Sequence, residues 1–130
     1  MLHSMQRFLI QGCIGLFTLG LASGVYALDC DRALTQVDMN ECAYLDFKKA
    51  DQRLNQLYQQ HRQGLDDQRK QQLKVAQQAW LKFRDLSCTY EADFYRGGSM
   101  APLVRQGCLT EATENRIKAL ENYIEMDGLL

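Results

Sequence analysis

The sequence predicts an all-α domain, a disulfide-stapled bundle in which a third, C-terminal helix completes two long antiparallel helices. Three observations support this prediction. Apolar residues recur at steps of three and four along three segments, proline and glycine fall between those segments, and an even number of cysteines remains once an N-terminal leader is set aside. No segment of the remaining chain alternates polar and apolar residues as a half-buried strand would.

The first 27 residues have the features of a secretory signal. Arg7 makes the N-terminus positive, and residues 8–25 carry no charge. The run ends in Val25-Tyr26-Ala27, which places small residues at the two positions that signal peptidase reads. We therefore expect residues 1–27 to be a cleaved signal peptide, residues 28–130 to form a single domain, and the mature protein to be periplasmic or secreted.

Two other arrangements compete with cleavage. The apolar run approaches the roughly 20 residues that span a bilayer, so it could serve as an uncleaved anchor, although glycines interrupt it. A lipid-anchored form would need a small residue before the modified cysteine, whereas Asp29 precedes Cys30. We expect cleavage, which leaves no membrane span in the mature protein.

The charge balance argues against nucleic acid as a partner. Removing the leader takes away Arg7, one of 15 basic residues, and none of the 16 acidic ones, so the net charge changes from −1 to −2. Such a balance gives no electrostatic footprint for nucleic acid or for an anionic membrane. The leader also contains Cys13, so four of the five cysteines remain, and an even count in an exported protein indicates two disulfides.

The first helix is predicted from about Gln36 to Gln63. Thr35, followed three residues later by Asp38, resembles an N-cap with an acid in the first turn, and Gly64 ends the segment. An amphipathic stripe lies between these limits, at Met39, Ala43, Phe47, Ala50, Leu54, Leu57 and His61.

The second helix is predicted from about Asp67 to Tyr95, with Asp66 as its cap and Gly97-Gly98 as its stop. The short connection at Gly64 makes it antiparallel to the first helix. Its most regular apolar stripe, which we expect to face the core, consists of Leu73, Ala76, Trp80, Phe83, Ser87, Tyr90 and Phe94, widened by Ala79 and Leu86.

The third helix is predicted after an irregular stretch, with Thr110 as a plausible cap. We expect it to cover the seam between the first two helices and to give a monomeric bundle. Stripes that persist over three heptads could also form a coiled-coil dimer, but a third apolar helix in the same chain favours packing within one molecule. The third stripe consists of Leu109, Ala112 or Thr113, Ile117, Leu120, and Tyr123 or Ile124.

The four remaining cysteines should meet at one end of the bundle. Counting outward from the turn near Leu65 places Cys42 level with Cys88, and Cys30 and Cys108 belong to the same end. We favour the bonds Cys30/Cys42 and Cys88/Cys108, because each closes a short local loop, and the rival is Cys42/Cys88 with Cys30/Cys108. A zinc site is the weaker use of these cysteines, since no C-x-x-C pair is present.

Few residues of the sequence are suited to catalysis. His61 is the only histidine after the leader, and its place in an apolar stripe indicates packing. Paired acids such as Glu91 and Asp93 could support glycoside chemistry, but they lie among polar positions. Three aromatic residues could form a sugar platform, although their spacing indicates the core: Tyr90, Phe94 and Tyr95. We predict no enzyme, no catalytic residue, no cofactor and no metal site.

An ordered set of motifs runs through nearly the whole mature chain. It comprises Cys30, Thr35-Gln36, Met39-Asn40-x-Cys42-Ala43, Ala50-Asp51-x-x-Leu54-Asn55-x-x-Tyr58, Gln78-Ala79-Trp80-x-x-Phe83-Arg84-Asp85-x-x-Cys88, Gly97-Gly98-Ser99-Met100-Ala101-Pro102 and Cys108-Leu109-x-x-x-Thr113-x-x-Arg116. With these motifs the chain resembles the lysozyme-inhibitor LprI-type domain, a family of bacterial exported proteins.

The resemblance implies an exported protein that binds a protein partner, and some members of the family inhibit lysozyme. We therefore expect a lysozyme inhibitor-like protein. The alternatives are a periplasmic envelope or stress-related adaptor without lysozyme affinity and, less favoured, a small hydrolase. The motif residues themselves look structural, and we expect Arg84 to pair with an acid of the third helix.

If lysozyme is the partner, the predicted contact segment runs from Arg96 to Arg105. Two glycines make it adaptable, and lysozyme's cleft works through two carboxylates that a hydroxyl or a guanidinium could bond. The plainer interpretation is that Ser99 caps a helix containing Pro102. The predicted contact residues are Arg96, Ser99, Met100 and Arg105.

An acidic surface on the third helix is the other candidate contact. Residues 107–130 hold five acids against Arg116 and Lys118, and an acidic face would attract a cationic lysozyme in a salt-dependent way. The five acids are Glu111, Glu114, Glu121, Glu125 and Asp127.

Overall fold

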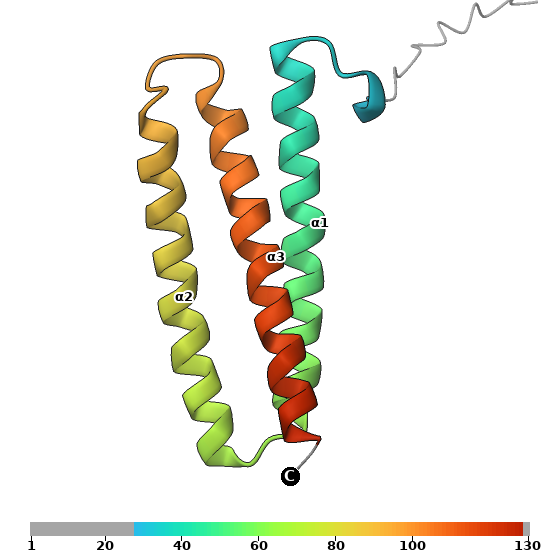
Figure 1. The fold of residues 1–130 in the computed structure, drawn as a ribbon, viewed down its shortest axis with the longest axis vertical. Helices are drawn as coiled ribbons and strands as arrows, with labels where there is room; N and C mark the ends of the chain where they lie inside the picture. The colour runs from blue at the N-terminus through green and yellow to red at the C-terminus, as the bar shows by residue number, and fades with distance from the viewer. Residues whose placement is uncertain (1–27, 129–130) are drawn as a thin grey trace, which may run out of the picture.

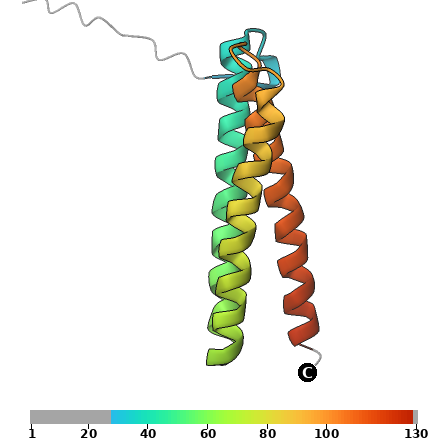
Figure 2. The same ribbon diagram turned by 90° about the vertical axis from the view of Figure 1, so that its left-hand side faces the viewer.

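The computed structural model describes residues 28–128, and the predicted signal peptide with Cys13 lies outside the described residues. Over that range the chain forms a short 3-10 helix, η1 (Cys30–Arg32), and three long helices, α1 (Gln36–Gln63), α2 (Asp67–Asp93) and α3 (Ala101–Asp127). Figures 1 and 2 show the three long helices side by side along the long axis of the molecule. The predicted all-α class is confirmed, and within residues 28–128 there is no strand.

The first two helices begin where their caps predict. The Thr35 hydroxyl oxygen accepts a hydrogen bond from the Asp38 backbone N–H at 3.0 Å, and an Asp66 carboxylate oxygen accepts one from the Arg69 N–H at 2.9 Å. Each cap satisfies one of the backbone donors that a helix leaves free at its start. The short link between Gln63 and Asp67 reverses the chain, so α1 and α2 run antiparallel (Figure 1).

The third helix begins nine residues before the predicted Thr110 cap, so that part of the prediction is wrong. It starts at Ala101, with Pro102 in its first turn, where the missing proline N–H costs no hydrogen bond. Thr110 lies inside the helix, and its hydroxyl donates to the Gln106 carbonyl at 2.9 Å. Ser99 is not the cap either, because the cap position is Met100 and no side chain bonds there.

The third helix does more than cover a seam. It packs along both α1 and α2, whereas α1 and α2 make few close backbone contacts with each other. In the view of Figure 1 α3 runs between the other two helices, and Figure 2, turned by 90°, shows that it lies to one side of both. The apolar core lies on α3 and its neighbours, where Leu54, Leu73, Ile117 and Leu120 form one buried cluster with Leu57, Tyr58, Leu65 and Trp80 packed around it.

The predicted core face of α2 is wrong for most of its residues. Leu73 is buried and Trp80 partly buried, as expected, but Phe83, Leu86, Tyr90 and Phe94 are 61–75% exposed. Ala76 and Ala79 are exposed as well. The buried positions of α2 are instead Leu73, Gln77, Arg84, Cys88 and Ala92.

The physical reason lies in the residues that must point inward. Cys88 is fully buried because it bonds Cys108 on α3, and Arg84, one turn earlier, is also buried. Successive residues of a helix point about 100° apart, so a buried Arg84 turns its neighbour Phe83 away from the core. The helix is therefore rotated relative to its most regular apolar stripe.

Both disulfides lie at the end of the bundle remote from Gly64. Cys30 bonds Cys42 with an S–S distance of 2.06 Å, and Cys88 bonds Cys108 at 2.02 Å. This is the first of the two pairings considered from the sequence. The first bond ties η1 to α1 and the second ties α2 to α3, so both segments that lead into a helix at this end are anchored covalently.

Candidate protein-binding surface

A buried arginine holds the middle of the bundle together. Arg84 is only 7% exposed, and its guanidinium donates to Asp51 of α1 at 3.0 Å, to Thr113 of α3 at 3.2 Å and to Asp85 at 2.9 Å. Its Cζ atom also lies 5.2 Å from the ring centroid of Phe47. One side chain thus links all three helices with charge-assisted hydrogen bonds and a cation–π contact.

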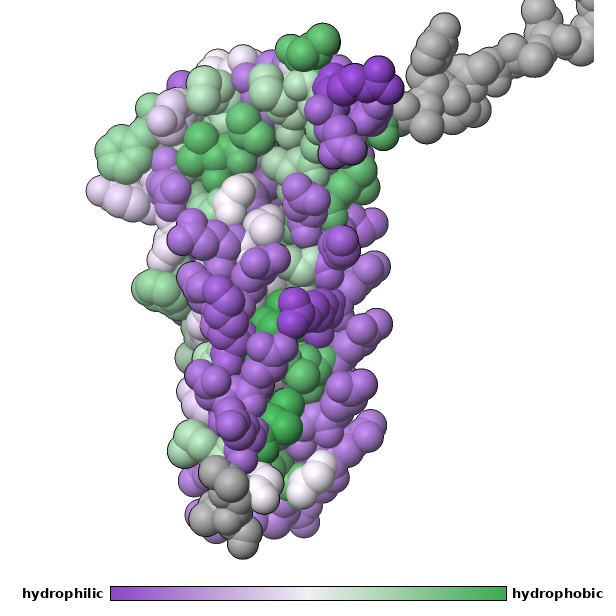
Figure 3. All heavy atoms as spheres, turned by 45° about the vertical axis from the view of Figure 1, so that its right-hand side comes forward, coloured by the Kyte–Doolittle hydropathy of each residue, from purple (hydrophilic) through white to green (hydrophobic). Residues whose placement is uncertain are grey.

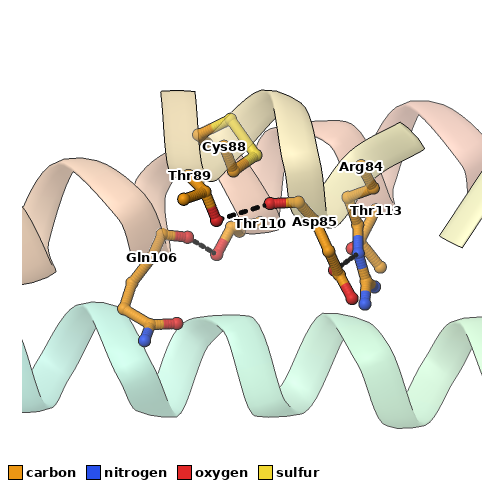
Figure 4. Close-up of a disulfide and its surroundings, with 8 residues drawn as sticks. Arg84, Asp85, Cys88, Thr89, Gln106, Thr110 and Thr113 are labelled. Carbon is orange, nitrogen blue, oxygen red and sulfur yellow. Dashed lines mark hydrogen bonds and ion pairs between the residues drawn. A yellow bond between two sulfur atoms is a disulfide. The ribbon is translucent and has the colours of Figure 1, made fainter. Parts of the chain in front are cut away.

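The observed partners of Arg84 differ from those predicted. The acid that it binds across the bundle belongs to α1, not to the third helix, and the neighbouring Asp85 also accepts from it. Figure 4 shows Arg84, Asp85 and Thr113 together beside the Cys88 disulfide. Since Asp51, Arg84 and Thr113 all belong to the motifs of the sequence, those motifs encode contacts between helices.

A second arginine extends this polar layer. Arg116 of α3 donates from Nε to the Gln77 side-chain oxygen at 2.9 Å, and its Cζ lies 5.8 Å from the ring centroids of both Trp80 and Tyr123. Trp80 also lies 5.1 Å from the Cζ of Arg84. The indole ring of Trp80 therefore lies close to two guanidinium groups. These contacts stabilise the partly buried ring in surroundings that are not purely apolar.

The predicted contact segment divides into a turn and the start of α3. Residues 94–100 connect α2 to α3, and Gly97 has φ +79°, a conformation that favours glycine. The Ser99 carbonyl accepts a hydrogen bond from the Asn40 side-chain amide at 3.1 Å, which fastens the turn to α1. Met100 is 44% exposed, and Arg105 is half-buried on α3. The four predicted contact residues thus share one end of the bundle.

Arg96 projects into solvent from this turn but is not free. Its guanidinium donates to both carboxylate oxygens of Asp93, one of them at 2.7 Å. The hydrogen bond from Arg96 holds the pKa of the Asp93 carboxyl below its usual value, and the same bond raises the pKa of Arg96. Because the pair is exposed, water competes for it, and the pair contributes little to stability.

The acidic surface of α3 is partly neutralised. Arg53 of α1 donates to Glu121 at 2.8 Å, and Asp127 pairs with Arg69 of α2 and lies 3.4 Å from the imidazole of His61. His61 is buried at the end of the α1 stripe, as predicted for a packing residue. These pairs leave the acidic helix with less free charge than its composition suggested.

An open groove runs along the surface where α1 and α3 meet. Its floor is apolar and its rims are polar, as the space-filling view shows along the middle of the molecule (Figure 3). The lining residues carry charges of both signs, so the groove favours neither a cation nor an anion. It is lined by Asp46, Lys49, Ala50, Gln52, Arg53, Gln56, Thr110, Glu114 and Ile117.

An exposed apolar surface lies on the outward side of α2, which periodicity had assigned to the core. Phe94, Tyr90 and Phe83 are 75%, 72% and 68% exposed. The rings of Tyr90 and Phe94 meet edge to face with their centroids 5.6 Å apart. Cys88 was the available sign that this stripe faces outward. It follows the stripe position Ser87 directly, and because it must reach a cysteine of another helix, it turns the stripe away from the core.

Within residues 28–128 no group of three or more His, Cys, Asp or Glu side chains is placed to hold a metal ion. Over the same range, no helix combines the length and the apolar character that a bilayer crossing requires. What the described residues do present is exposed aromatic and apolar side chains, of the kind enriched where proteins bind one another. The fold and its surface define a disulfide-bonded three-helix protein with features suited to protein contact.

Comparison with known proteins gives the family. The model of the family described as "Lysozyme inhibitor LprI" matches residues 30–120, so the chain belongs to this family. An uncharacterized protein of Rhizobium meliloti (strain 1021) is 34% identical over 110 residues, which covers 75% of this chain and 79% of that protein. No solved structure matches.

Proposed function

We propose that the protein is exported and inhibits a lysozyme by protein–protein contact, without catalytic activity of its own. Membership of the lysozyme inhibitor LprI family is the observation that carries this proposal. Two disulfides support export, because such bonds persist in oxidising compartments. The predicted signal peptide accords with the same location, periplasmic or secreted.

The contact surface that we propose is the turn between α2 and α3. Tyr95 and Met100 are each 44% exposed there, and Arg96 extends beside them. Tyrosine and arginine are, with tryptophan, the residues enriched at binding hot spots. The Cys88–Cys108 bond and the Asn40–Ser99 hydrogen bond hold the turn in place, so little conformational freedom is lost on binding.

Arg96 supplies the charge that a lysozyme cleft would recognise. Lysozyme acts through two carboxylates, one of them ionised, and a guanidinium bonds an ionised carboxylate strongly. Because the Asp93–Arg96 pair is exposed, exchanging Asp93 for a lysozyme carboxylate costs little. The apolar neighbours would exclude water from the new pair and so strengthen it.

The direct test measures lysis of bacterial cell-wall suspensions by several lysozyme types, with the oxidised, exported protein added in increasing amounts. We expect slower lysis, with affinity for the same lysozyme in a separate binding measurement. The absence of both effects for every lysozyme type would refute the proposal. Specific capture of an envelope protein in that case would assign the chain to the adaptor class.

A matched pair of variants tests the contact surface. Arg96→Ala combined with Met100→Ala should raise the inhibition constant by about thirtyfold, the equivalent of losing one hot spot. Arg32→Ala is the control, because Arg32 is also an exposed arginine that pairs with an aspartate three residues earlier, Asp29 at 2.8 Å. Equal inhibition by both variants and the parent would exclude the turn.

The acidic surface of α3 predicts a different result. Glu114→Gln with Glu121→Gln should slow association only at low salt if that surface steers a cationic lysozyme. The turn variant should weaken inhibition at every salt concentration. If only the acidic variant shows weakened inhibition of lysozyme, the contact surface lies on α3 and not on the turn.

A further inference from the structure

The exposed side of α2, together with its C-cap residue Phe94, carries a continuous uncharged stripe. We call it the outer stripe and define it by six residues at steps of three and four, all of them exposed: Ala76, Ala79, Phe83, Leu86, Tyr90 and Phe94. From its first to its last residue the stripe is about 27 Å long, at 1.5 Å per residue. No other part of residues 28–128 covers it, since α3 and the core lie on another side of α2.

The outer stripe is large enough to form a specific interface. Aromatic side chains have roughly 150–250 Å² each, and Phe83, Tyr90 and Phe94 are about 70% exposed, which gives roughly 300–500 Å² of free area. Leu86, 61% exposed, adds to it. A stable interface takes about 800 Å² from each partner. A little over half of such an interface is apolar, which is roughly 450–520 Å² on each side, and the outer stripe supplies an apolar area of that order.

The spacing of the stripe specifies the shape of its partner. Apolar residues at alternating steps of three and four form the seam along which one helix packs against another. The stripe is also graded in size, with alanines at its first end and Tyr90 and Phe94 at its last. A second helix of the same kind, running in the opposite direction, would place its large residues against the small ones.

We propose that the outer stripe is the interface of a homodimer, in which α2 of one copy packs antiparallel against α2 of a second copy. In the register centred between Phe83 and Tyr90, Phe83 lies level with Tyr90 of the second copy, and Ala79 lies level with its Phe94. Leu86 then lies beside the two-fold axis. Such an isologous contact covers both stripes with one interface.

This dimer does not depend on the proposed function, because it is measured without lysozyme. It replaces the monomer predicted from the sequence, where the same heptad stripe was assigned to the interior. The monomer was expected because the stripe was thought to pack in the core. The stripe is exposed instead, since α3 completes the core on the other side of α2.

Sedimentation of the oxidised, exported protein over a range of concentrations tests the dimer. We expect a monomer–dimer equilibrium that Phe83→Glu or Tyr90→Glu shifts toward monomer by about tenfold or more in dissociation constant. Val37→Glu is the matched control, because Val37 is 76% exposed on α1, away from the stripe. Thermal unfolding of each variant checks that the fold persists, which we expect because the substituted residues are exposed.

Two single cysteines test the direction. Leu86→Cys should give a disulfide-linked dimer on oxidation, because the two copies of that residue meet at the axis. Ala79→Cys should not, because its two copies would lie about 20 Å apart along the antiparallel pair. Efficient linkage at Ala79 would refute the antiparallel register.

Other results would overturn the dimer itself. A protein that stays monomeric at every concentration contradicts it, and so does a dimer that forms equally well with Phe83→Glu. If the protein is monomeric and the stripe variants lose lysozyme binding, the outer stripe belongs to the lysozyme contact and the homodimer is excluded.

Discussion

Removing the guanidinium of Arg84 should strongly destabilise the fold even though both disulfides stay intact. Arg84→Ala deprives Asp51 on α1 and the fully buried Thr113 on α3 of their common donor. It also removes the cation that lies 5.2 Å from Phe47 and 5.1 Å from Trp80. All three helices lose a shared contact at once.

The magnitude follows from these contacts. An unsatisfied buried polar group costs about 1–3 kcal/mol, and each partly desolvated cation–π contact contributes about 1 kcal/mol. We therefore expect Arg84→Ala to lower the free energy of unfolding by about 3–5 kcal/mol, the sum of one unsatisfied Thr113 hydroxyl and two lost cation–π contacts. For a domain of this size, that loss lowers the melting temperature by roughly 15–30 °C.

Urea unfolding followed by circular dichroism measures this loss, with the slope of the transition as a check that the unfolded state is unchanged. The control is Arg53→Ala, which breaks the exposed pair with Glu121 and should cost less than about 1 kcal/mol. Arg84→Lys keeps the charge but not the planar fork, so its stability should lie between the parent and Arg84→Ala. Equal stability of the two alanine variants would refute the bridging role of Arg84.

Three further results are expected. Replacing both Cys88 and Cys108 by Ser should cost about 3 kcal/mol in thermal unfolding by freeing the unfolded chain, and an unchanged melting temperature would contradict this. The pKa of the Asp93 carboxyl should lie below the ordinary value of an aspartate when measured by NMR, because Arg96 donates to it. The pairing therefore stabilises the fold at neutral pH and is lost as the pH falls through the lowered pKa, and Arg96→Ala should restore the ordinary pKa. His61→Gln should leave inhibition within a few fold, since this imidazole packs against Asp127, and a hundredfold loss with the fold intact would reverse the assignment of a non-enzyme.

The fold was largely predictable, because its helices are encoded locally. The caps Thr35 and Asp66 directly precede the helices that they start, and Gly64 lies where the chain reverses. The start of α3 was not predictable in the same way. Its cap position, Met100, makes no side-chain hydrogen bond, so the sequence contains no signal of the usual kind there.

The candidate surface was predictable only in part. The glycines and the flanking arginines of the sequence identified the turn as a candidate contact. Only the structure showed that Asp93 binds Arg96 and that Tyr95 is exposed. The outer stripe was recognised as a stripe and assigned to the wrong side. A period of three and four shows that residues share one side of a helix, but it does not show which side another helix covers.

The sequence by itself determined the three helices, the class of the fold and the family, because capping, periodicity and ordered motifs are properties of neighbouring residues. The tertiary structure alone decided how α2 is rotated. Gln77, Arg84 and Cys88 are buried because their partners, Arg116, Asp51 and Cys108, come from other helices. Three specific contacts across the bundle outweigh the hydrophobic preference of Phe83, Tyr90 and Phe94, whose apolar surface is thereby left on the outside.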